Sequence, residues 1–422
     1  MVASVDVPRP EAVAVQHERC DPLPVFDPNA WGGWQRGRPL AGLKAQECTA
    51  CFVLHPDSVV VAAGTADDAT RFERGRDWEA DLAWGSVGRL PGGRIGPAQP
   101  VFVSYAYTPA RLDSIVLDAA GALILRRGEP HIATPVPPAL SDGETSLANV
   151  FIERRMDAIS ADCLYPILES GFPEPPPSGP AVAARLLPGT LARLEGGEPL
   201  KVLAWGDSVT DGSFLDDPAR ERWQNQFVAR LRERFPQAQI ELITEAWGGR
   251  NTSLYLAEPP GSIHNYQEKV LDAKPDLVVM EFVNDAGLPA DVHEDRHLKL
   301  LEDFRRIGAE WIILTPHYIR PDWMGLSRQR EIDADPRPYV AFLRAFAARH
   351  GIALADASRR YGRLWRQGIP YNTLMKNTIN HPDARGMRIF ADSLMALFRS
   401  GDEAFRPRPG ARQAFDPTQD IT

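Results

Sequence analysis

The pattern of hydrophobic and polar residues differs between the two parts of this chain. In the first third, apolar residues occur in short runs between turn-forming residues, a pattern typical of β-strands. Val101–Tyr107 is the clearest predicted strand, and Leu112–Leu125 carries two apolar arms around Asp118–Gly121, which predicts a hairpin. Further runs lie at Cys51–Ala63, on both sides of a turn, and at Ser146–Glu153. We therefore expect a β-rich, sandwich-like module at the N-terminus.

After the proline-rich stretch Phe172–Pro180, predicted strands alternate with predicted helices. The strands are Lys201–Gly206, Ile240–Ala246, Asp276–Val283, Trp311–Thr315 and Ile352–Ala355. The helices are Arg222–Arg234, Asn265–Ala273, Asp295–Ile307, Arg337–His350 and Arg385–Phe398. Such alternation predicts an α/β domain in which helices cover both faces of a parallel sheet. Ligands of such sheets bind beyond the carboxyl ends of the strands.

These changes of pattern define the expected domains. Residues 1–171 are predicted to form the β-rich accessory domain, and 199–401 the α/β domain. Between them, residues 172–198 are expected to form a proline-rich linker, stiffened by its prolines, and a lead-in helix. Residues 402–422 are polar and contain proline, and they are expected to form a disordered tail.

Composition and charge narrow the classes of protein that fit the chain. Hydrophobic residues make up 44% of the 422 residues and charged residues 24%, as in an average soluble globular protein. There are 47 Lys and Arg against 56 Asp and Glu, a net charge of −9, which disfavours partners such as nucleic acid or an anionic membrane. No run approaches the roughly 20 apolar residues of a membrane helix, and the N-terminus lacks the pattern of a secretory signal. We expect a cytoplasmic protein.

The cysteines and histidines do not predict a metal site. Cys48 and Cys51 form a Cys-x-x-Cys pair, but no second pair stands at zinc-site spacing, so ordinary thiols are expected. His293 and His297 lie four residues apart on a predicted helix, and without a third ligand we expect them on a solvated face. No metal and no cofactor are expected.

A serine stands where the first strand of the α/β domain ends. The strand KVLAWG runs directly into Asp207 and Ser208, at the predicted start of a helix. The N–H groups and the positive dipole end of that helix would stabilise an oxyanion beside the serine. A helix N-cap is the alternative interpretation, because Asp and Ser are both favoured there.

Three further segments follow later strands or precede the last helix. Gly248 and Gly249 come after the second strand, and two glycines let a backbone N–H approach a ligand. Asn284 and Asp285 come after the third strand, where a simple turn is the alternative. His381 lies in the segment Asn377–Asp383, before an amphipathic helix, and a lone histidine is more often structural than catalytic.

Taken together, the four segments resemble the blocks of the SGNH or GDSL hydrolase family over about residues 199–399. The blocks GDSVTDG and NHPDARG carry most of the likeness. The resemblance implies a flavodoxin-like parallel sheet, Ser208 as the nucleophile and His381 as the general base. It also implies an oxyanion hole formed by Gly249, Asn284 and the N–H of Ser208.

The chain departs from the family pattern at two positions. Phe282 stands where glycine is usual, which is expected to alter packing more than chemistry. Thr378 stands three residues before His381, where the family usually has an aspartate that orients the histidine. Since some relatives work with a Ser–His dyad, both a triad and a dyad stay open. The candidate orienters are Thr378, Asn377 and Asp383, together with Asp356, for which a helix cap is the favoured interpretation.

By this likeness the chain is a serine esterase that acts through an acyl-enzyme on Ser208. No exposed apolar helix is evident that could cover a long acyl chain, so small, acetyl-like esters are favoured, including O-acetyl groups of a carbohydrate. The expected partner is a small-molecule or carbohydrate ester, and the oligomeric state is not predicted. Candidate substrate-binding residues are Asp207, Arg250 and Trp323, the last in a loop that mixes aromatic and charged groups.

Two alternatives stay open. An O-acyltransferase would use the same acyl-enzyme and pass the acyl group to an alcohol instead of water. A non-catalytic glycan-binding protein is favoured by Thr378 but disfavoured by the presence of Ser208, Gly249, Asn284 and His381 together. A phosphate-binding enzyme is disfavoured because no Gly-rich loop ends in Lys-Ser or Lys-Thr.

Overall fold

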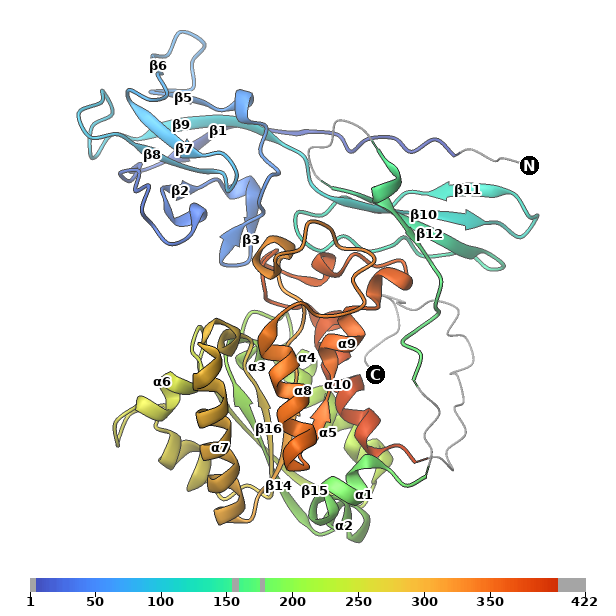
Figure 1. The fold of residues 1–422 in the computed structure, drawn as a ribbon. Coiled ribbons are helices and arrows are strands. Elements are labelled where there is room, and N and C mark those ends of the chain that lie inside the picture. Colours follow the sequence, from blue (N-terminus) through green and yellow to red (C-terminus); the bar gives the residue numbers. More distant parts are fainter. Residues whose placement is uncertain (1–4, 154–158, 175–178, 401–422) are drawn as a thin grey trace. The chain divides into compact units, whose positions relative to one another are not determined.

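The computed structural model describes residues 5–153, 159–174 and 179–400. Their contacts divide the chain into two compact units (Figure 1). Unit 1 comprises Met1–Leu168 and Arg366–Ile379, and unit 2 comprises Glu169–Trp365 and Asn380–Thr422. The sequence predicted consecutive domains, whereas these contacts group the short segment 366–379 with the N-terminal residues. The predicted tail 402–422 lies outside the described residues.

Unit 2 contains a parallel sheet of five strands in the order β15-β14-β16-β17-β18. Its strands are β14 (Pro199–Gly206), β15 (Gln239–Ala246), β16 (Leu277–Glu281), β17 (Glu310–Leu314) and β18 (Ala353–Ala355). Gly206 pairs with Ala246 on one side and with Glu281 on the other, so the carboxyl ends of three strands are aligned. The predicted flavodoxin-like sheet is confirmed.

Helices cover both faces of this sheet because its strands are apolar on both sides. Val202 and Ala204 of β14 pack in one core, while the alternate residues Leu203 and Trp205 pack in the other. The first core takes in α1 (Val182–Leu186), α2 (Pro188–Gly196), α5 (Trp223–Arg234) and α10 (Ala384–Met395). The second takes in α6 (Thr252–Ala257), α7 (Ala290–Ile307) and α8 (Pro338–His350). Short helices complete the unit: α3 (Ser208–Asp211), α4 (Pro218–Glu221) and α9 (Ala357–Tyr361).

One predicted helix of unit 2 needs refinement, and the departure at residue 282 is a change of packing. The predicted helix Asn265–Ala273 is a π-helix over Gln267–Leu271, in which the adjacent residues Val270 and Leu271 are both buried. Phe282, which replaces the usual glycine, packs edge-on against the fully buried Trp205, with 5.0 Å between the ring centroids. The departure at residue 282 therefore fills the core under the sheet edge, as expected.

The prediction that His293 and His297 lie on a solvated face is wrong. The side chains face the second core, with only 4% and 0% of each residue exposed. The ring of His293 stacks on Tyr339, and the ring of His297 on Trp311. Burial lowers the pKa of His297 to about 4, so this ring is neutral at pH 7. The i, i+4 spacing places both histidines on the same face of the helix, but it does not tell whether that face is buried.

The described part of unit 1 contains four antiparallel sheets, which confirms a β-rich N-terminal module. One sheet has the order β1 (Val13–Cys20), β9 (Val101–Tyr107), β5 (Val60–Ala62) and β6 (Arg71–Phe72). A second has the order β11 (Leu123–Arg126), β10 (Arg111–Leu117), β12 (Thr145–Ile152) and β13 (Leu164–Pro166), and includes the predicted hairpin. Two smaller sheets contain β2 (Arg38–Pro39), β8 (Ser86–Arg89) and β7 (Trp78–Asp81), and β3 (Lys44–Ala45) with β4 (Cys48–Thr49).

The segment 366–379 is held in unit 1 by polar contacts from distant positions. The Asn149 amide donates to the Gly368 carbonyl at 2.8 Å, and the Asn377 amide donates to Glu47 at the same distance. The thiol of Cys48 donates to the Asn377 carbonyl at 3.0 Å. All four cysteines are buried, and the Cys48 thiol of the Cys-x-x-Cys pair is engaged in this hydrogen bond. Ile379, the last residue of the segment, packs with Trp34 and Cys48.

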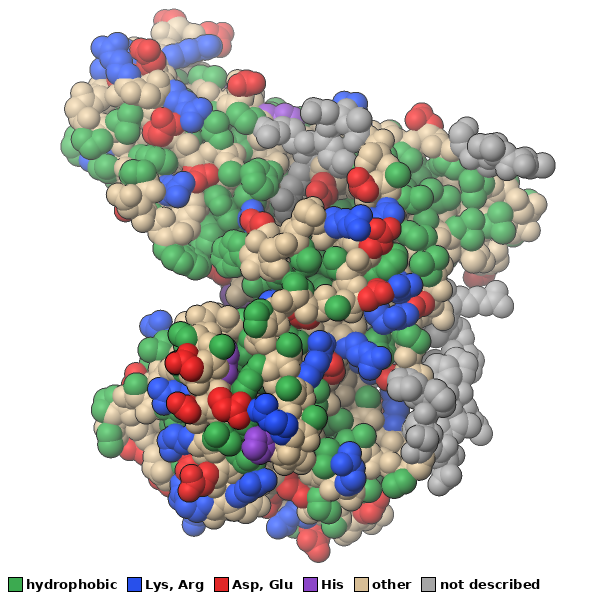
Figure 2. Space-filling view, in the orientation of Figure 1, with side chains coloured by type: hydrophobic (Ala, Val, Ile, Leu, Met, Phe, Trp, Pro, Cys, Tyr) green, Lys and Arg blue, Asp and Glu red, His purple; other side chains and the backbone are tan. Residues whose placement is uncertain are grey.

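The surface carries charges of both signs. Figure 2 shows basic and acidic side chains interspersed over the visible face of each unit. In the ranges that the structure describes, no helix has both the length and the apolar composition needed to cross a bilayer.

Candidate active site

Ser208 lies at the aligned carboxyl ends of the sheet in unit 2. Strand β14 ends at Gly206, and Ser208 is the first residue of α3. The turn is tight: a Cβ on Gly206 would lie 2.1 Å from Thr210 Oγ1 and 2.3 Å from the Glu281 carbonyl oxygen. Asp207 caps α3 by accepting a hydrogen bond from the Val209 N–H at 3.0 Å. Asp207 is the cap, as the N-cap interpretation predicted, and Ser208 is half-exposed beside it.

His381 meets Ser208 across the site. Its Nε2 lies 3.1 Å from the Ser208 Oγ, although the two residues are 173 positions apart. The histidine precedes α10, whose first turn is capped by Asp383 through the Gly386 N–H at 3.1 Å. The fold therefore gives a hydroxyl and an imidazole the separation of a hydrogen bond, which is the reach required of a nucleophile and its base.

Phe214 is part of this arrangement and was not found by sequence reasoning. Its ring is stacked on the His381 imidazole, with 4.2 Å between centroids and 3° between planes. The side chain is half-buried and packs against the first core of the sheet. A turn after α3, closed by the Leu215 N–H and the Gly212 carbonyl, places Phe214 six residues after Ser208. No spacing rule marks such a position, so nothing in the sequence pattern identifies it.

The glycine loop and Asn284 lie on either side of β14. A Cβ on Gly248 would lie 3.7 Å from the Ser208 Cβ, which places the loop beside the serine. Gly249 has a φ of +71°, a left-handed conformation in which other residues are strained. Asn284 donates to one Asp207 carboxylate oxygen from its N–H at 3.0 Å and from its side-chain amide at 2.9 Å. Its amide keeps a second hydrogen for another acceptor.

Three carboxyl groups are buried below the site. Burial raises the pKa of Asp207 to about 6, an effect opposed by hydrogen bonds from Asn284 and Val209 and by the nearby His381. Burial likewise raises the pKa of Asp285 to about 7, against hydrogen bonds from Thr252. Burial and then the charge of Asp207 raise the pKa of Glu281 well above its ordinary value. The raised pKa of Glu281 favours its protonated form, whereas Asp207, with a pKa of about 6, is mostly ionised at pH 7 and can fix Asn284.

The candidate orienters of His381 occupy different environments. Asn377 and Thr378 belong to unit 1, where Asn377 bonds Glu47 and the buried Thr378 hydroxyl has no hydrogen-bond partner within the described ranges. The Asp383 carboxylate caps α10 and accepts hydrogen bonds from Arg385 at 2.7 and 2.9 Å. Asp356 caps α9 and pairs with Arg344 at 2.9 Å, which confirms the favoured interpretation as a helix cap.

The candidate substrate-binding residues also differ. Asp207 is fully buried and engaged with Asn284. Arg250 is exposed, with its guanidinium 5.0 Å from the centre of the Trp247 ring, and Trp247 in turn stacks on His264 at 4.6 Å. Trp323 lies in a 3-10 helix, Pro321–Met324, and is 46% exposed. In the described ranges, no group of three or more His, Cys, Asp or Glu side chains is arranged to hold a metal ion.

Comparison with solved structures finds several esterases. A two-domain esterase active on acetylated mannans is 17% identical, with a TM-score of 0.41 over 53% of this chain and 56% of that chain. An acetylxylan esterase from Geobacillus stearothermophilus, as a catalytic mutant, is 18% identical, with a TM-score of 0.38 over 48% and 95%. A protein described as an arylesterase of Agrobacterium tumefaciens is 20% identical, with a TM-score of 0.33 over 47% and 97%. The match with the first of these spans little more than half of that esterase.

A family model matches the part of the chain that contains the candidate site. No curated protein matches the sequence. The model of the GDSL-like lipase/acylhydrolase family matches residues 204–389, which contain Ser208, Gly249, Asn284 and His381. This range begins within β14 and ends within α10, and therefore covers the carboxyl end of β14 and the other four strands of the parallel sheet. The matched range is 186 of the 422 residues, so the likeness to the GDSL-like lipase/acylhydrolase family is shown for this part of the chain, which contains both Ser208 and His381.

Proposed function

We propose that this chain is a serine esterase that hydrolyses small, acetyl-like esters through an acyl-enzyme on Ser208. The observation that carries this proposal is the 3.1 Å separation of His381 Nε2 and Ser208 Oγ at the carboxyl ends of the sheet. A nucleophile and a base at this distance are sufficient to begin acyl transfer.

In the first step, His381 Nε2 takes the Ser208 proton as Oγ forms a bond to the ester carbonyl carbon. The electron pair of the carbonyl moves to its oxygen. When the tetrahedral intermediate collapses, the bond to the alcohol oxygen breaks, and the imidazolium gives its proton to that oxygen. Water then attacks the acyl-enzyme with the same base, releasing the acid and restoring Ser208.

The negative charge on the carbonyl oxygen needs hydrogen-bond donors. We assign these donors to the N–H groups of Ser208 and Gly249 and to the side-chain amide of Asn284. In comparable sites, the loss of one donor costs about 2.7–4 kcal/mol of barrier. Because the ionised Asp207 accepts two hydrogen bonds from Asn284, it acts as a positioning residue for this amide.

His381 gains a positive charge in the same step, and Phe214 lies against its ring. The face of an aromatic ring attracts a cation, while two neutral rings prefer offset or edge-on contacts. The parallel stack therefore favours the imidazolium over the neutral ring. We assign Phe214 as a positioning residue that fixes the orientation of the His381 ring. In the family, an aspartate three residues before the histidine usually orients this ring.

The surroundings of Ser208 favour a small acyl group on a polar alcohol. Gly248 and Gly249 present no side chain beside the serine, so the loop adds no apolar wall for a long acyl chain. Next to them, Arg250, Trp247 and His264 form a stacked, partly exposed group. Aromatic faces with polar edges suit a sugar ring, and we propose O-deacetylation of a carbohydrate as the reaction.

A fluorophosphonate probe and p-nitrophenyl acetate test the proposal. We expect the probe to label the native protein but not Ser208→Ala, and His381→Ala to lose at least about 10⁴-fold in kcat. Labelling of neither protein would support a glycan-binding protein without catalysis. Turnover in the presence of an added alcohol distinguishes the transferase, since transfer that outpaces hydrolysis would contradict an esterase.

A further inference from the structure

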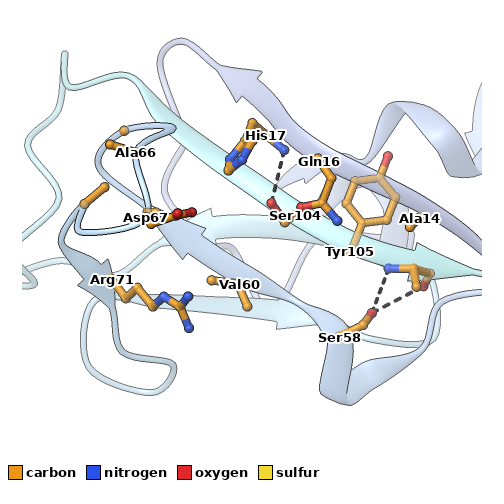
Figure 3. A pocket seen from close by; sticks show the side chains of 14 residues that line it. Ala14, Gln16, His17, Ser58, Val60, Ala66, Asp67, Arg71, Ser104 and Tyr105 are labelled. Carbon is orange, nitrogen blue, oxygen red and sulfur yellow. Dashed lines mark hydrogen bonds between the residues drawn. The ribbon is translucent and has the colours of Figure 1, made fainter.

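Unit 1 has a pocket of about 330 Å³ on one face of the sheet β1-β9-β5-β6 (Figure 3). Residues from the four strands and from the loop between β5 and β6 line it. This volume falls in the usual range for small-molecule sites, about 300–1,000 Å³. The pocket belongs to unit 1 alone, so it is distinct from the site around Ser208.

The floor of the pocket is hollow because its side chains are small. Strand β9 buries Val101, Val103 and Tyr105 in the core of unit 1, and the intervening residues Ser104 and Ala106 face the pocket. Alternation of this kind gives a sheet two different faces. The small residues of the lining are Ala14, Ala62, Gly64, Ala66, Ala69 and Ala106.

A β-bulge adds polar groups to this floor. The pairing of β1 with β9 shifts register between Val15 and Glu18, and His17 has a φ of +58°. The His17 N–H donates to the Ser104 Oγ at 3.1 Å instead of to the strand ladder. In a regular strand, Gln16 and His17 would point to opposite faces, but at this bulge both line the pocket.

Four polar side chains of the pocket are exposed and available to a ligand. Among the described residues, none forms a hydrogen bond or ion pair with the side chains of Gln16, His17, Asp67 or Arg71, all of which are exposed. Figure 3 shows Asp67 and Arg71 at the end of the pocket that lies away from Ser58. A carboxylate, a guanidinium, an amide and an imidazole thus share one small hollow.

We infer that this pocket binds a neutral, hydroxyl-rich ligand, namely one or two rings of a saccharide. An anion would meet Asp67 and a cation would meet Arg71, whereas a hydroxyl group donates to the first and accepts from the second. The alanine methyl groups of the floor suit the C–H face of a sugar ring. Since the pocket holds one charge of each sign, its charge balance matches a ligand without net charge.

Isothermal titration of the full chain tests this inference. The probes are neutral tetrasaccharides of glucose, mannose, xylose and galactose, with inorganic phosphate and spermidine as charged comparisons. We expect at least one tetrasaccharide to bind, and the double variant Asp67→Ala/Arg71→Ala to bind it at least about tenfold more weakly. Ala62→Leu, which fills the floor without changing charge, should weaken binding similarly.

Asp68→Ala is the matched control, because Asp68 is exposed in the same loop but does not line the pocket. It should bind as the native chain does. Thermal melting of each variant shows whether the fold is kept. The inference is overturned if no tetrasaccharide binds, if both pocket variants bind like the native chain, or if phosphate or spermidine binds instead.

Discussion

The residues assigned to catalysis are held in two different ways. Around Ser208 the contacts come from within unit 2: Asp207 caps α3, Asn284 bonds Asp207, and the glycine loop lies beside the serine. His381, in contrast, lies two residues after Ile379, at which a segment packed in unit 1 ends. The nucleophile thus depends on a regular sheet edge, and the base depends also on a segment that folds with the other unit.

This difference separates what regular strand pairing fixes from what irregular contacts fix. The sheet of unit 2 aligns the ends of its strands, so it brings Ser208 and Asn284 together by regular pairing. The segment 366–379 contains no strand of that sheet and is fixed by contacts such as those of Asn377 with Glu47 and Cys48. The residues that directly precede the loop of His381 are therefore packed within unit 1. Four predictions test or sharpen this contrast.

The largest effect is expected at the serine side. Asn284→Ala should lower kcat for p-nitrophenyl acetate by about 10²–10³-fold, since it removes one oxyanion donor. KM should change little. Asn225→Ala is the control, because its amide donates to the Ala219 carbonyl, away from the site. A loss of less than tenfold would exclude Asn284 from the oxyanion hole.

Phe214→Leu should have the next largest effect. Loss of the ring face is expected to lower kcat by about 3- to 30-fold, with KM within about twofold. Phe214→Tyr keeps the face and should restore most of the activity. Phe235→Leu is the matched control for packing, since Phe235, like Phe214, is half-buried against the first core of the sheet. Equal losses in Phe214→Leu and Phe235→Leu would indicate a packing effect alone.

Catalytic activity and the stability of the fold should respond to pH in opposite directions. Below about pH 6, protonation of Asp207 weakens its hold on Asn284, so turnover should fall by about half at that pH and further below it. Because burial raises the pKa of Asp207 and Asp285 in the folded state, protonation stabilises the fold, and this contribution is lost as pH rises through about 6 and 7. Kinetics and thermal melting at matched pH check this. A melting temperature that falls together with activity between about pH 7 and 5 would contradict it.

The smallest effect is expected at the position of the missing aspartate. Thr378→Ala should lower kcat by less than about threefold, because its buried hydroxyl has no hydrogen-bond partner in the described part of the chain. His381→Ala in the same assay is the reference. If both variants lost activity equally, the threonine would be an orienter of the base, and a dyad would be ruled out.

The sequence by itself determined the regular part of this protein. Alternating strands and helices predicted the parallel sheet, since a strand buried on both faces leaves a continuous apolar run. The serine after the first strand and the asparagine after the third predicted chemistry at one edge, because parallel strands end on the same side. The strand Val101–Tyr107 and the hairpin after it could also be predicted, because alternating apolar and polar residues and a turn are sufficient to define them.

Only the tertiary structure decided which distant groups meet. The stack of Phe214 on His381, the burial of His293 and His297, and the packing of residues 366–379 in unit 1 all depend on non-local contacts. The pocket formed at the bulge of β1 depends likewise on the register against β9, set about 85 residues later in the chain. A local pattern reports which face of an element is apolar. It does not report which partner covers that face, because that choice is made by the packing of the whole chain.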